Sequence, residues 1–412
     1  MSGSRGMGPV LIALATLGQV AGASAESGYT RSYIPIPEVI VDPNEGNTFG
    51  LMGVVLLVDK ASEEIRYIFA PDIRYNETKG VFPTFRLFGF PSDTREYSVA
   101  AGKSTTRDEF YKLHFEDWAL WDERLFFVGH AEFDRDSTQR FWGFGNDSRE
   151  SNETNYTGAD VEVTATPGIW LLPSVHLSYQ MRIRYLEVQK GQVDRCEGQS
   201  PCPFTLTSFP GLVATDQDDG FFWAHLLAIS YDSRDSLDLP TEGLLGRLYL
   251  EAADRQLGSS TSFVKFGLEG KTFIPFRAAA KNPVLALRAA LDYVSGSRDT
   301  PFWERSSLGG KRSLRGFGSD RFIDFNRSLV SAELRTRVYQ RQLFGTHVEL
   351  ELAPFLETGQ VFPDVTSSPV DDLHFVFGLG TRFLARPKVI AFVDMGMADE
   401  GLKVFTGIDY PF

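Results

Sequence analysis

Apolar and charged residues alternate along most of this chain with a period of two, and this alternation most constrains its fold. In residues 346–358, Val and Leu occupy one set of alternate positions and Glu occupies the other. The same pattern recurs in residues 178–186, 262–272 and 329–339. Because successive side chains of a strand point to opposite faces of a sheet, the pattern predicts a series of half-buried β-strands.

Two architectures produce this pattern: soluble sandwiches or propellers, and transmembrane barrels. The polar faces carry long Arg, Lys and Glu side chains on strand after strand, and the other faces are apolar, as in outer-membrane barrels with strands of about 10 residues. A closed barrel also pairs every backbone group within lipid, which an open sheet cannot do. No internal repeat of a propeller blade is evident. We therefore expect an all-β, antiparallel transmembrane barrel.

The expected barrel has 16 strands, an even number of the kind found in bacterial barrels. A further apolar stretch, residues 49–58, is a seventeenth candidate that the pattern does not place. The 16 expected strands are residues 65–75, 81–90, 95–103, 109–118, 124–134, 154–166, 174–188, 221–232, 244–254, 262–274, 284–294, 326–340, 346–358, 374–386, 389–396 and 403–412.

The lengths of the connections predict an orientation. If the last strand ends in the periplasm, the long connections fall outside the cell and the shorter ones inside, as outer-membrane barrels require. The long connections are residues 135–153, 189–220, 295–325 and 359–373.

The N-terminus has the pattern of a cleaved export signal. Arg5 is the only charged residue before Glu26, and the apolar run between them ends in Ala23-Ser24-Ala25. This run is shorter than the roughly 20 residues that a spanning helix needs. We expect a signal peptide over residues 1–25, a short periplasmic segment over 26–48 and an outer-membrane barrel over 49–412.

Charge and composition exclude several classes of function. The 54 acidic and 41 basic residues give a net charge of -13, which disfavours a nucleic-acid partner. Six scattered His form no H-x-x-x-H pair, and no G-x-S-x-G segment occurs, so no enzyme, metal ion or cofactor is predicted. The two cysteines, Cys196 and Cys202, lie in a connection expected outside the cell, where a disulfide is predicted.

The longest unbroken motif lies in residues 295–325, a basic, Gly-rich stretch that also holds Phe and Trp. Taken alone, such a stretch predicts a flexible surface loop. Its motif residues are Gly309, Gly310, Leu314, Arg315, Gly316 and Phe317.

Followed by Ala332-Glu333-Leu334-Arg335, this motif resembles the C-terminal barrel of the BamA/TamA superfamily, the bacterial surface antigen family. The resemblance extends over roughly residues 40–412 and implies that the extracellular loop folds back into the barrel lumen. Four further segments match the family in order: Asp42–Gly46, Phe141–Asn146, Tyr231–Gly243 and Phe355–Gly359.

The resemblance also implies partners for the loop arginine. An Arg that enters a barrel loses bulk water and needs carboxylate partners, which its forked guanidinium can bind in pairs. Glu333 and Glu357 lie on the charged faces of their strands, at positions where the family carries the acids that lock the loop. We predict that Arg315 bridges both acids, although the family commonly has Asp where this chain has Glu357.

The C-terminus resembles the signal that the barrel-assembly machinery reads, with a partial match. Its residues are Gly407, Ile408, Tyr410 and Phe412. Pro411 lacks an N–H group, which weakens strand pairing at the closing strand. In this superfamily the first and last strands form a seam that opens laterally, and a poorly paired last strand is consistent with such a seam.

Insertases of the superfamily carry POTRA domains before the barrel, and residues 26–48 are too few for one, so a barrel-only member is expected. The expected function is outer-membrane biogenesis, in which the seam and the lumen loop insert or translocate polypeptide or move lipid. A passive channel is the alternative, because a barrel of this size can enclose water. A scaffold or adhesion role is a third reading. The expected partners are the outer-membrane bilayer, client polypeptides and a periplasmic helper protein, with the barrel itself a monomer.

Overall fold

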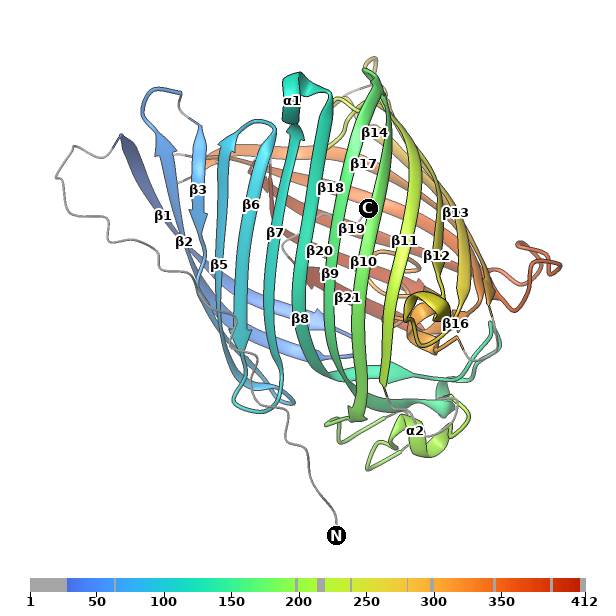
Figure 1. Cartoon of the computed structure of the whole chain (residues 1–412). Coiled ribbons are helices and arrows are strands. Elements are labelled where there is room, and N and C mark those ends of the chain that lie inside the picture. The colour runs from blue at the N-terminus through green and yellow to red at the C-terminus, as the bar shows by residue number, and fades with distance from the viewer. Residues whose placement is uncertain are drawn as a thin grey trace, which may run out of the picture.

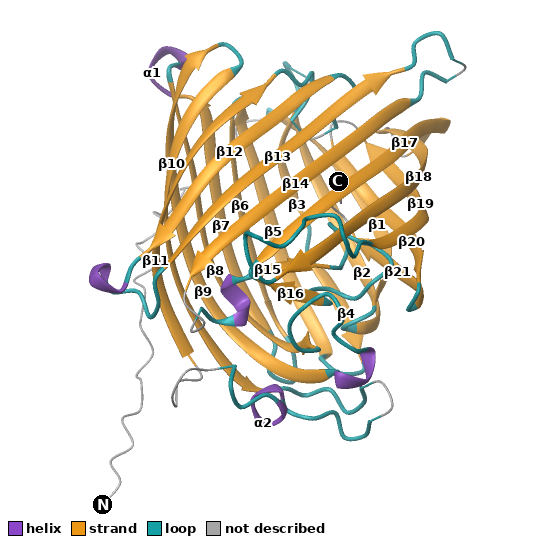
Figure 2. Ribbon diagram, turned by 90° about the vertical axis from the view of Figure 1, so that its right-hand side faces the viewer, coloured by secondary structure: helices purple, strands orange, loops and turns teal. Residues whose placement is uncertain are grey.

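The computed structural model describes residues 28–407, apart from residues 63, 197–198, 213–218, 238, 280, 297–299, 344–345 and 386–387. Over residues 342–347 and 385–390 it describes at most the backbone. The chain forms one antiparallel sheet of long, tilted strands that curls into a barrel (Figures 1 and 2). The expected all-β barrel fold is confirmed. The expected signal peptide, residues 1–25, lies outside the described residues.

The strands fall into a barrel wall and a small hairpin, with a few one-turn helices between them. The helices are α1 (Leu120–Glu123), α2 (Thr205–Ser208) and the 3-10 turns η1 (Glu150–Asn152), η2 (Arg255–Leu257) and η3 (Phe302–Glu304). The hairpin is β15 (Ser306–Leu308) and β16 (Phe322–Asp324). The wall strands are β1 (Tyr29–Asp42), β2 (Gly46–Asp59), β3 (Ile65–Phe69), β4 (Asp72–Asn76), β5 (Gly80–Ser92), β6 (Arg95–Lys103), β7 (Glu109–Ala119), β8 (Leu125–Phe141), β9 (Thr154–Leu172), β10 (Val175–Lys190), β11 (Asp219–Asp232), β12 (Gly243–Ala253), β13 (Phe263–Pro275), β14 (Val284–Gly296), β17 (Asn326–Leu343), β18 (Thr346–Phe362), β19 (His374–Ala385), β20 (Lys388–Ala398) and β21 (Gly401–Gly407).

The wall contains more strands than the expected 16, so that number is not confirmed. The described part of the sheet has 19 strands. β3 and β4 both pair with β2 on one side and β5 on the other, so these two occupy a single position in the wall. Pro71 lies between them and has no N–H to give to the ladder. Counted by position, the described wall has 18 strands.

The two additional positions are the first hairpin, β1 and β2. Its register runs without a shift from Tyr29 opposite Asp59 to Asp42 opposite Gly46. The expectation that residues 26–48 form a separate periplasmic segment is therefore wrong. The prolines at positions 35 and 37 obscured the strand, and they are tolerated because β1 is the first strand of the sheet. The stretch 49–58, which the sequence pattern did not place, is most of β2.

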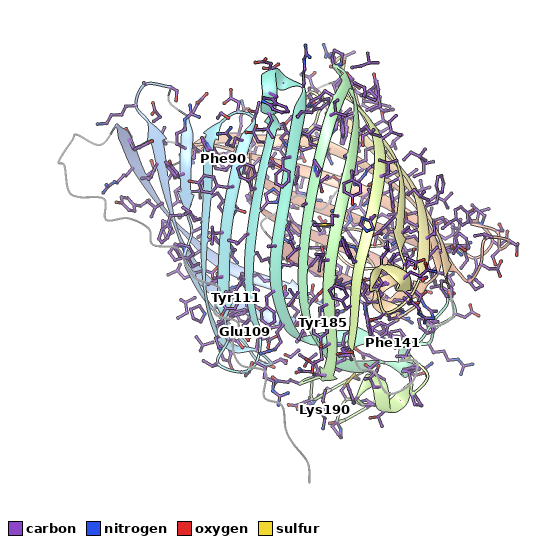
Figure 3. All side chains as sticks on the ribbon, in the orientation of Figure 1. Phe90, Glu109, Tyr111, Phe141, Tyr185 and Lys190 are labelled. Atoms are coloured by element: carbon purple, nitrogen blue, oxygen red, sulfur yellow. A yellow bond between two sulfur atoms is a disulfide. The ribbon has the colours of Figure 1, made fainter. Side chains whose placement is uncertain are left out.

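The two faces of the wall differ as the alternation predicts. On β7, Tyr111, Leu113 and Phe115 are exposed on the outer face. Lys112 and His114 alternate with them and form ion pairs with acidic neighbours on the inner face. Side chains cover both faces of the wall (Figure 3). Among the described residues no helix has the length and apolar character to span a membrane.

The long connections gather at one end of the barrel. Because consecutive wall strands are antiparallel, alternate connections lie at opposite ends. The end that holds α2 carries the connections 142–153, 191–218, 297–325 and 363–373. The opposite end, which holds α1, carries shorter turns (Figure 1). This arrangement matches the expected alternation, in which the long connections share one end of the barrel, predicted to face outside the cell, and the short ones share the other.

The barrel closes where β1 and β21 lie side by side. Within the described residues no backbone ladder joins these two strands. Instead the hydroxyl of Thr406 accepts a hydrogen bond from the N–H of Val41 at 2.9 Å and donates one to the carbonyl of Val39 at 2.9 Å. Within the described residues, one side chain thus supplies two hydrogen bonds between β1 and β21. Gly407 ends β21, and the other C-terminal signal residues, Ile408, Tyr410 and Phe412, lie outside the described residues.

We predict that Thr406→Val loosens the seam and leaves the rest of the barrel intact. The substitution keeps the side-chain shape and removes two hydrogen bonds, each worth about 1 kcal/mol. Amide hydrogen exchange of the peptide that contains Val39 and Val41 should become up to about thirtyfold faster, the equivalent of about 2 kcal/mol. Thr358→Val is the matched control, because Thr358 also donates to a neighbouring strand but lies in a complete ladder. Equal acceleration in both variants would contradict the prediction.

Candidate functional site

The candidate site is the connection between β14 and β17, which enters the barrel. Figure 2 shows the β15–β16 hairpin of this connection inside the barrel. The hairpin pairs Ser306 with Asp324 and Leu308 with Phe322, and residues 309–321 form its tip. Hereafter residues 300–325 are called the lumen loop.

Two glycines allow the tip to turn back on itself. Gly309 and Gly310 have φ values of +113° and +95°, in the left-handed region that other residues rarely adopt. A Cβ on Gly309 would lie 2.3 Å from the carbonyl oxygen of Gly318. The N–H of Gly310 donates to the carbonyl of Phe317 at 3.2 Å and closes the turn. The Gly-Gly pair therefore sets the position of the motif that follows.

An apolar cluster fixes the tip to the wall. Leu314 and Phe317 are fully buried. The ring of Phe322 stacks on the ring of His374, with ring centroids 3.9 Å apart. Burial of each large apolar side chain contributes about 1.5–3 kcal/mol. The cluster comprises Ala290, Leu308, Leu314, Phe317, Phe322, Leu329, Phe355, Val361 and Val376.

Arg315 lies between these apolar residues, only 1% exposed, and contacts both predicted acids. Its N–H and Nε donate to Glu357 at 2.7 and 3.0 Å. Its Nη1 donates to Glu333 at 2.9 Å. The guanidinium also lies over the ring of Phe355, 3.6 Å from its centroid. The structure thus places Arg315 directly against Glu333 and Glu357 with no gap for water between them.

Three residues that the sequence analysis did not select complete the network. Asp394 accepts a hydrogen bond from Arg315 Nη1 at 2.9 Å. Arg382 donates to Asp394 and to Glu333, the latter at 3.4 Å. Arg335 donates to Glu333 at 3.0 Å. Three cations therefore meet three carboxylates in this network.

A signal for two of these residues is present in the sequence. Asp394 is the single charge in Ala391-Phe-Val-Asp-Met-Gly-Met, and Arg382 is the single charge in Gly378-Leu-Gly-Thr-Arg-Phe-Leu. A lone charge in an otherwise apolar membrane strand is costly on the lipid face and therefore indicates an inward, partnered position. Arg335 lay on a strand face already recognised as charged and was not distinguishable from its neighbours.

The carboxylates keep Arg315 charged despite its burial. Burial alone would lower the pKa of the guanidinium, because it removes the water that stabilises the charged form. Glu357, Glu333 and Asp394 outweigh this effect and raise the pKa of Arg315 above its usual range. A buried charge is tolerated only with close carboxylate partners of this kind. Among the described residues, Nη2 of Arg315 has no hydrogen-bond partner.

Close backbone approach is the second requirement of the site. A Cβ on Gly396 would lie 2.3 Å from the carbonyl oxygen of Arg315. Gly316 faces Ala398 on the same strand, where an added Cβ would lie 2.8 Å from the alanine Cβ. β20 therefore presents a glycine where the loop backbone contacts the wall.

A second ion-pair cluster holds the start of the lumen loop. Glu304 accepts from Arg182 at 2.6 Å and from Arg184 at 3.0 Å, both on β10. Burial would raise the pKa of Glu304, but the two arginines outweigh it and lower the pKa. The loop is therefore anchored at two separate places on the wall: Glu304 on β10, and Arg315 on β17, β18 and β20.

The segment Phe141–Asn146, matched above by resemblance, packs against the lumen loop. Trp142 lies beside the guanidinium of Arg321, 5.2 Å from its ring centroid. The guanidinium of Arg305 lies between the rings of Phe144 and Phe325, at 4.0 and 4.1 Å from their centroids. Burial lowers the pKa of Arg305 to about 10, so it remains charged at neutral pH.

The two cysteines lie at the extracellular end, away from this network. Cys196 and Cys202 form a disulfide, with Cα atoms 4.9 Å apart. Arg140 at the end of β8 donates to the Sγ of Cys196 at 3.2 Å. The bridge therefore stiffens the connection between β10 and β11.

These features define a class: transmembrane barrels in which an extracellular loop is held inside the lumen by a buried arginine and wall carboxylates. The Omp85 superfamily domain matches residues 95–383, and the chain belongs to this superfamily. The resemblance to BamA/TamA barrels is thereby confirmed.

The solved structure of one BamA agrees with this fold. BamA from Haemophilus ducreyi lacking POTRA domains 1–3 is 12% identical with a TM-score of 0.55, over 92% of this chain and 75% of that chain. CdiB from Acinetobacter baumannii is 9% identical with a TM-score of 0.46, over 91% of this chain and 59% of the other. CdiB from Escherichia coli is 10% identical with a TM-score of 0.49, over 93% and 63%. The chain therefore spans less than two thirds of either CdiB. No curated protein matches the chain.

We predict that Arg315→Ala destabilises loop docking by about 3–5 kcal/mol, because it leaves buried carboxylates without their shared cation. The loop should leave the lumen, and single-channel conductance of the reconstituted barrel should rise. Arg312→Ala is the control, because Arg312 is exposed in the same loop. An unchanged conductance in Arg315→Ala would show that the apolar cluster alone holds the loop.

A second prediction tests the close approach of the loop backbone to β20 without changing any charge. Gly396→Ala retains every charge but places a methyl group against the Arg315 carbonyl, and such overpacking costs about 1–3 kcal/mol. It should increase protease cleavage within residues 309–321. Gly270→Ala is the matched control, since an added Cβ there meets nothing within 4 Å. Identical cleavage in the two variants would rule out the close approach as a requirement for docking.

Proposed function

We propose that this protein acts in outer-membrane biogenesis, inserting or translocating polypeptide through the seam between β1 and β21. In this proposal the chain is exported by its N-terminal signal and resides in the outer membrane. Membership of the Omp85 superfamily and the likeness of its fold to that of BamA support the proposal.

The observation that carries the proposal is that the lumen loop bridges the seam. Asn44, in the turn between β1 and β2, bonds both backbone groups of Ser319 at 3.0 and 3.1 Å. Two residues further on, Arg321 donates to Glu400, in the turn between β20 and β21, at 2.7 Å. One short segment of the loop thus holds the two hairpins that flank the seam.

This bridge suggests how the seam is controlled. While the loop is docked, Ser319 and Arg321 hold the two hairpins together at their extracellular ends. When the loop is released, the single Thr406 contact is the described link between β1 and β21. An opened seam presents unpaired N–H and C=O groups, which can template a strand of a client chain.

A passive channel is the second candidate, favoured by one observation. Lys112 and Glu132, on the inner faces of β7 and β8, retain 38% and 22% side-chain exposure. The lumen loop therefore does not cover this part of the wall, and a charged, water-accessible path is compatible with ion flow.

An insertion assay tests the proposal. The full mature chain is reconstituted into liposomes, and the folding rate of an unfolded outer-membrane barrel is compared with that in empty liposomes. We expect faster folding with the wild type than in empty liposomes. Arg315→Ala should lose most of this acceleration, and Arg312→Ala should retain it. Lack of acceleration together with steady single-channel conductance would refute the proposal and favour the channel.

A further inference from the structure

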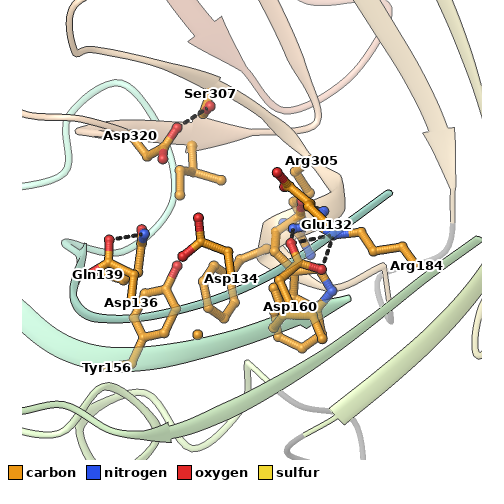
Figure 4. Close-up of a pocket in the computed structure, with 15 residues that line it drawn as sticks. Glu132, Asp134, Asp136, Gln139, Tyr156, Asp160, Arg184, Arg305, Ser307 and Asp320 are labelled. Atoms are coloured by element: carbon orange, nitrogen blue, oxygen red, sulfur yellow. Dashed lines mark hydrogen bonds and ion pairs between the residues drawn. The ribbon is translucent and has the colours of Figure 1, made fainter. Parts of the chain in front are cut away.

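A cavity of about 290 Å³ lies between the lumen loop and the wall strands β8, β9 and β10. Figure 4 shows the loop residues Asp320 and Ser307 on one side and the wall residues Asp134, Asp136 and Tyr156 on the other. The proposed function uses none of these contacts. A volume of this size is at the lower limit of ligand pockets, about 300 Å³. It suits one extended side chain or an equally small molecule.

Acidic groups dominate the polar lining. Five carboxylates and two guanidinium groups face the cavity. The lining acids are Glu132, Asp134, Asp136, Asp160 and Asp320, and the lining bases are Arg184 and Arg305.

Four of these acids already have cation partners in the wall. Lys112 contacts Glu132 at 3.1 Å and Asp134 at 2.9 Å. Lys79 contacts Asp136 at 3.1 Å. Asp160 shares Arg184 with Glu304, at 2.7 and 3.0 Å. Each wall acid thus has a cation partner that holds its position, although each cation is shared with at least one other carboxylate.

Asp320 differs from the wall acids. It has a φ of +55° at the end of the loop tip and accepts a hydrogen bond from the Ser307 hydroxyl at 2.6 Å. Within the described part of the chain no Lys, Arg or His pairs with it. Its negative charge is therefore available to a ligand in the cavity.

Tyr156 is the second, independent observation. Its side chain lines the cavity and is only 8% exposed, and its ring packs edge-on against Phe302 with centroids 5.3 Å apart. The Tyr156 hydroxyl makes no hydrogen bond with any residue that the structure describes. A hydroxyl that faces a cavity and has no protein partner is available to a polar ligand in that cavity.

We propose that this cavity binds the cationic end of an alkyl amine, with the ammonium between Asp320 and Tyr156. The aromatic rings of Tyr156, Phe302 and Trp303 line the same cavity and suit an alkyl chain with a positive end. Among the described residues no group of His, Cys, Asp or Glu has the arrangement to hold a metal ion. The aromatic lining beside an acidic group fits an organic cation.

Two sources supply this chemistry: a lysine side chain of a polypeptide in the lumen, and a free diamine. This inference does not rest on insertase activity. Amine binding can be measured with no client polypeptide present. A failed insertion assay would leave this inference untouched.

The test is calorimetric titration of the purified full mature chain in detergent micelles. The probes are cadaverine, a five-carbon diamine, and pentanediol, its neutral counterpart. We expect saturable binding of cadaverine that weakens as salt rises, and none of pentanediol. Tyr156→Phe should weaken cadaverine binding about two- to tenfold, and Asp320→Asn about tenfold or more.

The controls separate a built site from general attraction to an acidic protein. Asp371→Asn removes an exposed carboxylate at the same end of the barrel and outside the cavity, and should leave binding unchanged. Both test substitutions preserve side-chain shape, and heat-modified gel mobility checks that each variant is a folded barrel. Equal weakening by Asp371→Asn and Asp320→Asn, or equal binding of pentanediol and cadaverine, would overturn the proposal.

A peptide titration then identifies the source. A capped Gly-Lys-Gly peptide is compared with its norleucine analogue. Lysine-dependent binding that is lost in Asp320→Asn assigns the site to polypeptide side chains. Cadaverine binding without peptide binding assigns it to a free diamine. If neither cadaverine nor the lysine peptide binds, the proposed site is refuted.

Discussion

The buried ion network around Arg315 is the interaction on which the rest of the site depends. Charged groups removed from water lose several kcal/mol of solvation each, and close pairing with opposite charges offsets this loss. The network supplies such pairing with three cations and three carboxylates from the loop and from β17, β18, β19 and β20. The geometry of this network therefore fixes the loop backbone. That backbone lies so close to β20 that only glycine fits at position 396.

Docking of the loop and closure of the seam are physically coupled. The segment that follows Arg315 carries Ser319 and Arg321, which bind the hairpins on either side of the seam. Contacts of these kinds are each worth about 0.5–3 kcal/mol. A docked loop thus adds to the stability of a seam that, in the described part of the chain, is joined by the hydrogen bonds of Thr406. By linkage, an event that opens the seam must weaken docking by the same free energy.

The sequence could predict the fold class and part of the site, but not all of it. Glu333 and Glu357 were predictable because they lie on alternating strands downstream of a distinctive loop motif. Asp394 and Arg382 each carry a sequence signal, a lone charge in an apolar strand, but that signal does not show that they meet Arg315 until the strands are placed. The first hairpin was missed because two prolines in residues 29–42 disfavour a strand, and only its position at the start of the sheet makes them acceptable.

Release of the loop requires more than the loss of one contact, because its anchors lie on separate parts of the wall. Glu304 is bound to β10, Arg315 to β17, β18 and β20, and Arg321 to the turn after β20. These pairs break together only if the loop moves as a unit, so the undocked state is rarely populated in the free protein. In the proposed function, a client favours that state only through contacts that the docked state lacks. The edges of β1 and β21, joined among the described residues by the Thr406 hydrogen bonds, would offer such contacts once the seam opens.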